Sequence, residues 1–446
     1  MVAGAAVSRL GMIFALLAAA IFLGLIWPMA LSLGGFAFSV PFDQISALDS
    51  SGHGLAATYL VAGTAIAVML CAGLMFRGLD VPESAALRWG ALTAWATLSV
   101  AWAQDASVAL ERMPTVVALY ALYVVACCTR FRPSEVSVIV RATVLGGVAA
   151  AAYALWQYQS GIAYHDSARA SLVVGERATD PNVFAASLLL PFCLALAAVF
   201  ADTRRTRQAV MAAAVLLIAS GIAVTMSRGA LLAVCVIVLV FAWRLRWGFK
   251  TLVPFAAVAC LLPWLPDLFL TRLRGALDTG GAGRLSIWEA GLNAFFHYGW
   301  RGAGLDNFES VFPAFAGKGQ NFVGLARDAH NIYLALGVEL GIVGIVLFAI
   351  ALRAQLEMVA EARQFAWDKK GYTQAVACEA ALWGMLTASF FLNMMWKKPL
   401  WLCLILCSLV AKESRRALHE HRALLCSEIP ELCEPDDAYA FTAESK

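Results

Sequence analysis

Charged side chains are scarce in this sequence. Only 14% of the 446 residues are Asp, Glu, Lys or Arg, whereas 61% are hydrophobic, and the mean hydropathy is +0.74. A water-soluble domain carries about a quarter charged residues, so this deficit excludes a soluble fold for most of the chain. The composition therefore predicts a protein that is solvated mainly by lipid.

The sequence also lacks metal-ligand spacing and a basic face. The eleven cysteines lie in apolar stretches or in the polar C-terminal segment, without the pairing typical of zinc sites or of extracellular disulfide frameworks. The net charge is only +3, and the basic residues are scattered through loops. We therefore expect no metal, no cofactor and no nucleic-acid partner.

Long apolar runs are abundant instead. Runs of about twenty apolar residues can cross a bilayer as helices, and they predict an all-α polytopic membrane protein with about 12 transmembrane helices. The first run follows Arg9 and is too long for a cleaved signal peptide. The approximate limits are 10–33, 55–76, 86–103, 112–128, 136–158, 182–201, 208–226, 229–243, 250–266, 331–352, 374–395 and 399–411.

Lysine and arginine in short connections predict the orientation in the membrane. With the N-terminus inside, each short cytoplasmic connection is basic, for example at Arg77, Arg130, Arg204 and Arg244. Both termini are then cytoplasmic. Residues 1–411 form the predicted membrane domain, and residues 412–446 form a polar cytoplasmic tail to which we assign no fold.

Two long segments fall outside in this topology, at about 159–181 and 267–330, the second between helices 9 and 10. Such long connections are usually functional. Residues 284–296 predict an amphipathic helix at the membrane surface, followed by a tight glycine-rich turn. The side chains of the predicted apolar face are Leu285, Trp288, Leu292 and Phe295, and the glycines are Gly299, Gly302 and Gly304.

Arg228 stands out because it lies in a very short external hairpin, near the edge of the bilayer. An ionisable group at that depth is a functional candidate, and its expected partner is an anion. An arginine that binds lipid headgroups is the alternative. Arg284 begins the predicted surface helix and faces the same space, where it is either a second anion ligand or an ordinary solvated residue.

Arg177 and Asp180 precede Pro181, which is well placed as the first residue of a helix. Asp180 or Thr179 could cap that helix, whose dipole favours a nearby anion; an Arg177–Asp180 ion pair is the alternative. His330 lies at the start of the run 331–352. An imidazole there could accept a proton near neutral pH, or could simply cap the helix or contact headgroups.

Several short segments occur in one order along about residues 90–400, and together they resemble the O-antigen ligase and polymerase superfamily. The segments are 177–182, 227–232, Arg284 with Trp288, 299–308, 329–333, 339–341 and Gly344. Each is weakly specific alone, and their order in one polytopic chain carries the resemblance.

The resemblance implies a GT-C-like, metal-independent, inverting glycosyltransferase at the periplasmic face of the bacterial inner membrane. Its donor would be a glycan on undecaprenyl diphosphate, and its acceptor would be lipid A core or a growing polysaccharide. His330 would be the catalytic base, and Arg228 and Arg284 would stabilise the leaving diphosphate. The implied substrate-binding residues are Arg177, Asp180, Asn182, Arg301 and Asn331.

Three functions remain open at this point. A ligase and a polymerase of this superfamily differ mainly in their acceptor, and no motif separates them. A secondary transporter also fits the number of spans and the position of the termini, but it should show internal repeats and ionisable groups in the middle of spans. The two halves of the sequence show no similarity to each other, and the charged residues gather at the external edge of the spans.

Overall fold

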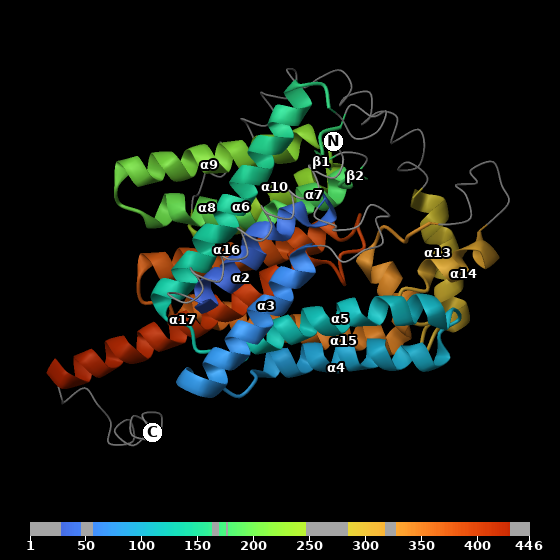
Figure 1. Cartoon of the computed structure of the whole chain (residues 1–446), viewed down its shortest axis with the longest axis horizontal. Coiled ribbons are helices and arrows are strands. Elements are labelled where there is room, and N and C mark those ends of the chain that lie inside the picture. The colour runs from blue at the N-terminus through green and yellow to red at the C-terminus, as the bar shows by residue number, and fades with distance from the viewer. Residues whose placement is uncertain are drawn as a thin grey trace, which may run out of the picture.

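The structure is a computed structural model, and it describes residues 28–45, 57–162, 169–174, 177–246, 284–316 and 327–428. Its described part is a bundle of helices with a short antiparallel hairpin of β1 (Val173–Val174) and β2 (Arg177–Ala178) (Figure 1). The helices in chain order are α2 (Pro28–Ser39), η1 (Val40–Ile45), α3 (Ala57–Ala72), η2 (Gly73–Arg77), α4 (Ser84–Leu98), η3 (Ser99–Trp102), α5 (Ala106–Cys128), α6 (Pro133–Gln159), α7 (Pro181–Ser187), α8 (Leu189–Ala201), α9 (Arg205–Val224), α10 (Arg228–Arg244), α13 (Arg284–Tyr298), α14 (Phe308–Phe315), α15 (Ile332–Phe365), α16 (Lys369–Ala388) and α17 (Lys398–Glu428).

Six of the described helical segments are long and apolar enough to cross a membrane, which agrees with an all-α membrane protein. They are Thr58–Arg77, Ala106–Cys128, Pro133–Gln159, Pro181–Ala201, Arg205–Val224 and Ile332–Phe365. The predicted runs 86–103, 229–243, 374–395 and 399–411 also coincide with helices, namely α4, α10, α16 and α17. The run 250–266 and most of the run 10–33 lie outside the described residues, so the count of 12 stays a prediction.

Two helices continue beyond their predicted limits. Helix α15 runs to Phe365 because the turns after residue 352 still bury apolar side chains, among them Met358 and Val359. Helix α17 runs to Glu428, through the first part of the segment for which we predicted no fold. In Figure 1 the C-terminal part of α17 lies at the opposite end of the bundle from α13 and α14.

Helix α16 lies in the centre of the bundle, where it packs against α8, α10, α15 and α17. A polar contact inside the apolar core links α4, α5 and α15. The Gln355 side-chain oxygen accepts hydrogen bonds from the Trp89 indole (3.3 Å) and the Tyr123 hydroxyl (3.0 Å). Both rings also pack against Trp401 of α17. Because a buried polar group is costly unless paired, this contact fixes how the four helices meet.

Basic residues at the predicted cytoplasmic ends form ion pairs with buried or half-buried carboxylates. Arg77 lies 2.7 Å from Glu135, and Arg244 lies 2.5 Å from Glu379, which Arg363 also contacts. These arginines therefore have structural partners within the protein.

Helix α13 confirms the predicted helix at residues 284–296, and it packs on the protein through a face that was not predicted. The side chains against the core are Ile287, Ala290, Gly291 and Ala294. Trp288 and Phe295 flank that face, while Leu285 and Leu292 are exposed. The predicted apolar stripe is thus divided, because small residues allow α13 to pack closely on α15. Its exposed leucines fit the proposed location at a membrane surface.

The turn after α13 inserts into a break in α15. Gly302 (φ 79°) and Gly341 (φ 68°) both adopt left-handed backbone conformations, and Gly341 interrupts α15. Backbone hydrogen bonds join the two segments, from Ala303 N to Val338 O and from Gly304 N to Glu339 O, each 2.8 Å long. A Cβ on Gly302 would lie 2.3 Å from the Glu339 carbonyl oxygen. This contact fixes the C-terminal end of α13 relative to α15.

We expect Gly302→Ala to destabilise the protein more than Gly161→Ala does. Both glycines have positive φ, but a Cβ on Gly161 would meet nothing within 4 Å. The control substitution should therefore cost only about 1 kcal/mol of backbone strain, whereas the clash at Gly302 should add about 2 kcal/mol or more. Thermal unfolding of the two purified variants checks this difference, and equal midpoints would contradict it.

Candidate active site

Arg228 is held at the start of α10 by a tight turn. Met226 adopts a left-handed conformation (φ 53°), and the Ser227 side chain then caps the helix. Gly229 packs directly on Phe391, since a Cβ at residue 229 would lie 2.9 Å from that ring. The half-buried Arg228 side chain therefore starts from the point where α10 meets the segment after α16.

Arg284 begins α13 and is brought to the same place by Phe391. Its guanidinium carbon lies 5.6 Å from the centre of the Phe391 ring. Burial lowers the pKa of Arg284, the positive charge of Arg228 lowers it further, and the carboxylate of Asp180 raises it. Among the described residues, no carboxylate lies within ion-pair distance of either guanidinium. Two cations thus share one local environment with no carboxylate of the described residues in contact.

His330 lies directly before α15 in a left-handed conformation (φ 44°), and its side chain is half-buried. The segment is held on both sides. The Trp288 indole of α13 donates a hydrogen bond to Ala329 O (3.2 Å), and Ile332 N donates one to Ser389 O (2.9 Å). A non-glycine residue in this conformation costs free energy and is often found at functional sites.

The charges around His330 come from several segments that are distant in sequence. Burial lowers the pKa of its imidazole, as do the positive charges of Arg284 and Lys397, whereas the carboxylates of Asp328 and Asp180 raise it. The net effect is a lowered pKa, so the imidazole is neutral near pH 7 and able to accept a proton. The charge of Arg228 acts on Arg284, and the charge of Arg284 acts on His330, so the three predicted residues are electrostatic neighbours in that order.

Asp180 caps α7, as predicted, by accepting hydrogen bonds from Asn182 N (2.8 Å) and Val183 N (3.1 Å). Its negative charge also acts on Arg284 and His330. Arg177 lies in β2, but its side chain is outside the part of the chain that the structure describes. The proposed Arg177–Asp180 pair is therefore neither confirmed nor contradicted.

Asn182 has a partner that the sequence did not suggest. The Arg169 guanidinium donates a hydrogen bond to the Asn182 side-chain oxygen (2.7 Å) and another to Thr225 O (2.9 Å). Arg169 therefore connects the start of α7 to the turn that precedes Arg228. These contacts indicate that Arg169 positions both segments.

Two further predicted residues have contacts of their own. Asn331 caps α15, where its side-chain oxygen accepts hydrogen bonds from the backbone N–H groups of Tyr333 and Leu334. Arg301 is exposed, and its guanidinium lies over the ring of Trp102, 5.9 Å from its centre. Asn331 thus fixes the start of α15 directly after His330, and Arg301 contacts η3.

Asp328 and Lys397 belong to the cluster but were not predicted. Asp328 accepts a hydrogen bond from the Asn393 side chain (3.4 Å), and both charges act on His330. A signal for Lys397 was present in the sequence, because Lys397 and Lys398 form a basic pair in a short connection predicted to lie outside, against the usual bias. Within the described ranges, no group of three or more His, Cys, Asp or Glu side chains could hold a metal ion.

A family model matches the part of the chain that contains Arg228, Arg284, Asp328 and His330. Residues 212–349 match the family described as O-antigen ligase. The chain carries an O-antigen ligase domain. The match confirms the superfamily resemblance, and the matched ligase segment includes Arg228, Arg284 and His330. No curated protein is significantly similar to the chain.

We expect His330 to titrate below the ordinary histidine pKa of about 6.5. Asp328→Asn removes a negative charge and should lower this pKa further, whereas Arg284→Gln removes a positive charge and should raise it. NMR titration of the full chain with labelled histidines measures these values, and His330→Gln identifies the signal.

Glu289→Gln is the matched control, because it removes a carboxylate from the exposed face of α13 and should leave the titration unchanged. Shifts of the same sign in Asp328→Asn and Arg284→Gln would disprove this arrangement of charges.

Proposed function

We propose that this protein transfers a glycan from undecaprenyl diphosphate to an acceptor hydroxyl at the periplasmic face of the bacterial inner membrane, as an O-antigen ligase. The observation that carries the proposal is the convergence of Arg228, Arg284 and a neutral imidazole of His330 from three separate segments of the chain. The O-antigen ligase domain favours this function over secondary transport.

The proposed reaction is a single displacement. The acceptor oxygen forms a bond to the anomeric carbon of the donor glycan, and the bond from that carbon to the diphosphate oxygen breaks. His330 takes the proton of the acceptor hydroxyl, and the electron pair of the broken bond leaves with the diphosphate. Attack from the face opposite the leaving group inverts the anomeric configuration.

Arg228 and Arg284 are suited to stabilise the leaving group. A guanidinium stays charged and can donate two parallel hydrogen bonds to phosphate oxygens. Two such groups with no carboxylate in contact among the described residues can supply the positive charge that a divalent metal supplies in other enzymes, so we propose a metal-independent reaction.

The remaining predicted residues have supporting roles in this proposal. Asp180 and Asn331 fix the starts of α7 and α15, next to the reacting groups, and Asn182 holds Arg169 in place. Arg177 and Arg301 would contact more distant parts of the glycan or its lipid carrier. The acceptor is proposed to be lipid A core, and a growing polysaccharide is the alternative for a polymerase.

Arg228→Ala and His330→Ala should each reduce glycan transfer at least about a hundredfold, because each removes a group that acts in the transition state. Arg228→Lys should recover part of the loss, since it keeps the charge but not the planar fork. Transfer is measured with purified protein and lipid-linked donor. Arg353→Ala, which removes an exposed arginine, is the control and should retain normal transfer. Near-normal turnover of either site variant would show that its proposed role is wrong.

A deletion strain should accumulate lipid-linked oligosaccharide. Gel patterns of its lipopolysaccharide separate the two candidate acceptors: loss of all attached O-antigen indicates a ligase, and attachment of a single repeat indicates a polymerase. Expression of the wild-type chain should restore the pattern, and expression of His330→Ala should not. An unchanged pattern together with altered uptake of a small solute would instead support a transporter.

A further inference from the structure

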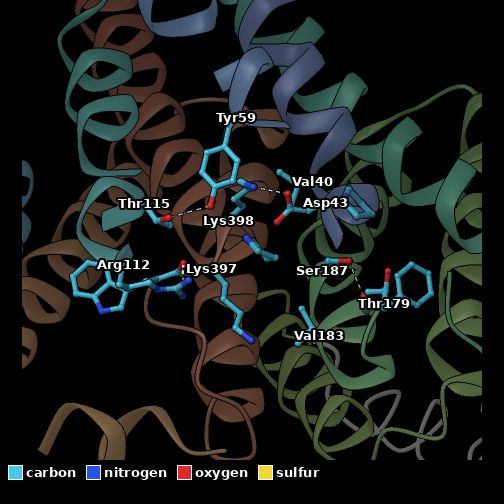
Figure 2. Close-up of a pocket in the computed structure, with 14 residues that line it drawn as sticks. Val40, Asp43, Tyr59, Arg112, Thr115, Thr179, Val183, Ser187, Lys397 and Lys398 are labelled. Carbon is cyan, nitrogen blue, oxygen red and sulfur yellow. Dashed lines mark hydrogen bonds and ion pairs between the residues drawn. The ribbon is translucent and has the colours of Figure 1, made fainter. Parts of the chain in front are cut away.

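A cavity of about 240 Å³ lies beside the candidate active site, between η1, α3, α5, α7 and the start of α17 (Figure 2). This volume is slightly below the range of about 300 to 1,000 Å³ that is typical of drug-sized ligands, and it suits a group about the size of one sugar unit. Arg112, Lys397 and Lys398 line it with positive charges, whereas Asp43 is the one carboxylate among the described lining residues. The cavity is therefore positively charged overall.

Lys398 is neutralised within the protein. Its buried ammonium group contacts the Asp43 carboxylate, donates a hydrogen bond to the Thr58 hydroxyl (2.7 Å) and lies 3.8 Å from the centre of the Tyr59 ring. The Asp43 carboxylate and the Thr58 hydroxyl accept hydrogen bonds from its N–H groups, and the Tyr59 ring stabilises its positive charge. Lys398 thus forms part of the wall.

Lys397 is not neutralised in this way, and Arg112 is only partly neutralised, through an ion pair with Asp306 (3.7 Å) and a hydrogen bond to the Trp396 carbonyl oxygen (3.4 Å). In Figure 2 the Lys397 side chain extends away from the Lys398–Asp43 pair. No carboxylate of the described residues lies within ion-pair distance of its amine. The Arg112 Nε is buried without a hydrogen-bond partner in the described structure, because its nearest carboxylate oxygen, on Asp306, is 3.7 Å away. Lys397 therefore has no carboxylate partner among the described residues, and Arg112 keeps one N–H group that can donate a hydrogen bond to an anion.

Hydroxyl groups complete the polar lining. Thr179 is 2% exposed, and its hydroxyl has no hydrogen-bond partner among the described residues. Leaving such a buried group unpaired costs free energy, which a bound ligand can recover. Tyr59 and Thr115 add two more hydroxyls on the opposite side, 3.1 Å apart. Separate hydroxyls around a charged centre suit a sugar better than they suit a bare anion.

We propose that this cavity is a second subsite, which binds a sugar residue bearing a carboxylate or a phosphate; its role in turnover rests on the glycan transfer proposed above. Lys397 and Arg112 bind the anionic group, and Thr179 binds a sugar hydroxyl. The subsite adjoins the reacting groups, because Lys397 acts electrostatically on His330 and Thr179 directly precedes Asp180. A glycan residue held here would lie next to the residue that reacts.

The test is direct binding of small probes to the full chain in phosphatidylcholine nanodiscs, measured by ligand-observed NMR. The probes are glucuronic acid, glucose 6-phosphate, glucose and inorganic phosphate. We expect one or both sugar acids to bind more tightly than glucose and inorganic phosphate, which separates a carboxylate ligand from a phosphate ligand. Lys397→Gln and Arg112→Gln should each weaken that binding at least about tenfold, the loss of one charge-assisted hydrogen bond.

Matched variants make the result specific. Lys369→Gln removes an exposed lysine at the start of α16 and should bind as the wild type does. Arg228→Ala should also bind the sugar acids normally, even though it abolishes transfer. Loss of binding in Arg228→Ala would place the acid in the diphosphate site and overturn the separate subsite. Equal binding of glucose or inorganic phosphate, unchanged binding in Lys397→Gln, or no binding of either acid would also overturn it. None of these readouts depends on transfer activity, so the proposed function can fail or hold independently.

Discussion

The guanidinium groups of Arg228 and Arg284 repel each other in a half-buried space, and the surrounding structure has to hold them there. Burial and the like charge both lower the pKa of Arg284, which shows that the two cations are costly to keep together. The Phe391 ring contacts both helix starts, and the Asp180 charge offsets part of the repulsion from a distance. In the proposed function, the diphosphate of the donor binds between them and relieves the rest. The arrangement would then be stabilised most when this substrate is bound, which is also when the proposed reaction needs it.

Helix α13 is the element that connects these groups to His330, the proposed base. Arg284 is the first residue of α13. The turn after the last residue of α13 inserts at the break in α15 around Gly341. Trp288, one turn into α13, bonds to the carbonyl group immediately before His330. The start of α13 is thus fixed to the segment directly before α15, and its end is fixed to α15 itself. The strained conformation of His330 is maintained by these contacts, and any shift of α13 would move Arg284 and His330 together.

The sequence allowed much of this site to be predicted, and the reasons for the omissions are physical. Arg228 and His330 could be found because their charge and position conflict with a bilayer environment, and because ordered motifs surround them. Asp180 could be recognised as a cap from the proline that follows it.

Lys397 was missed, although the basic pair that it forms with Lys398 in a connection predicted to lie outside conflicts with the positive-inside rule. Arg169 could not be found, because its role depends on contacts with α7 and with the turn before α10 that no local pattern encodes. The face of α13 that packs on the protein was not predicted, because the large apolar residues marked the helix, whereas small residues set how closely two helices approach.

The cations at the two ends of the described bundle differ in how they are neutralised. At the predicted cytoplasmic ends, Arg77 and Arg244 contact carboxylates at distances of 2.7 and 2.5 Å. Around the candidate site, Arg228, Arg284 and Lys397 have no such contact with any described carboxylate. A buried or half-buried cation without an internal partner is destabilising unless water or a ligand compensates it, so stability alone does not explain these three. Their cost is understandable if the missing partner is the substrate, whose phosphates and acidic groups arrive from outside the protein.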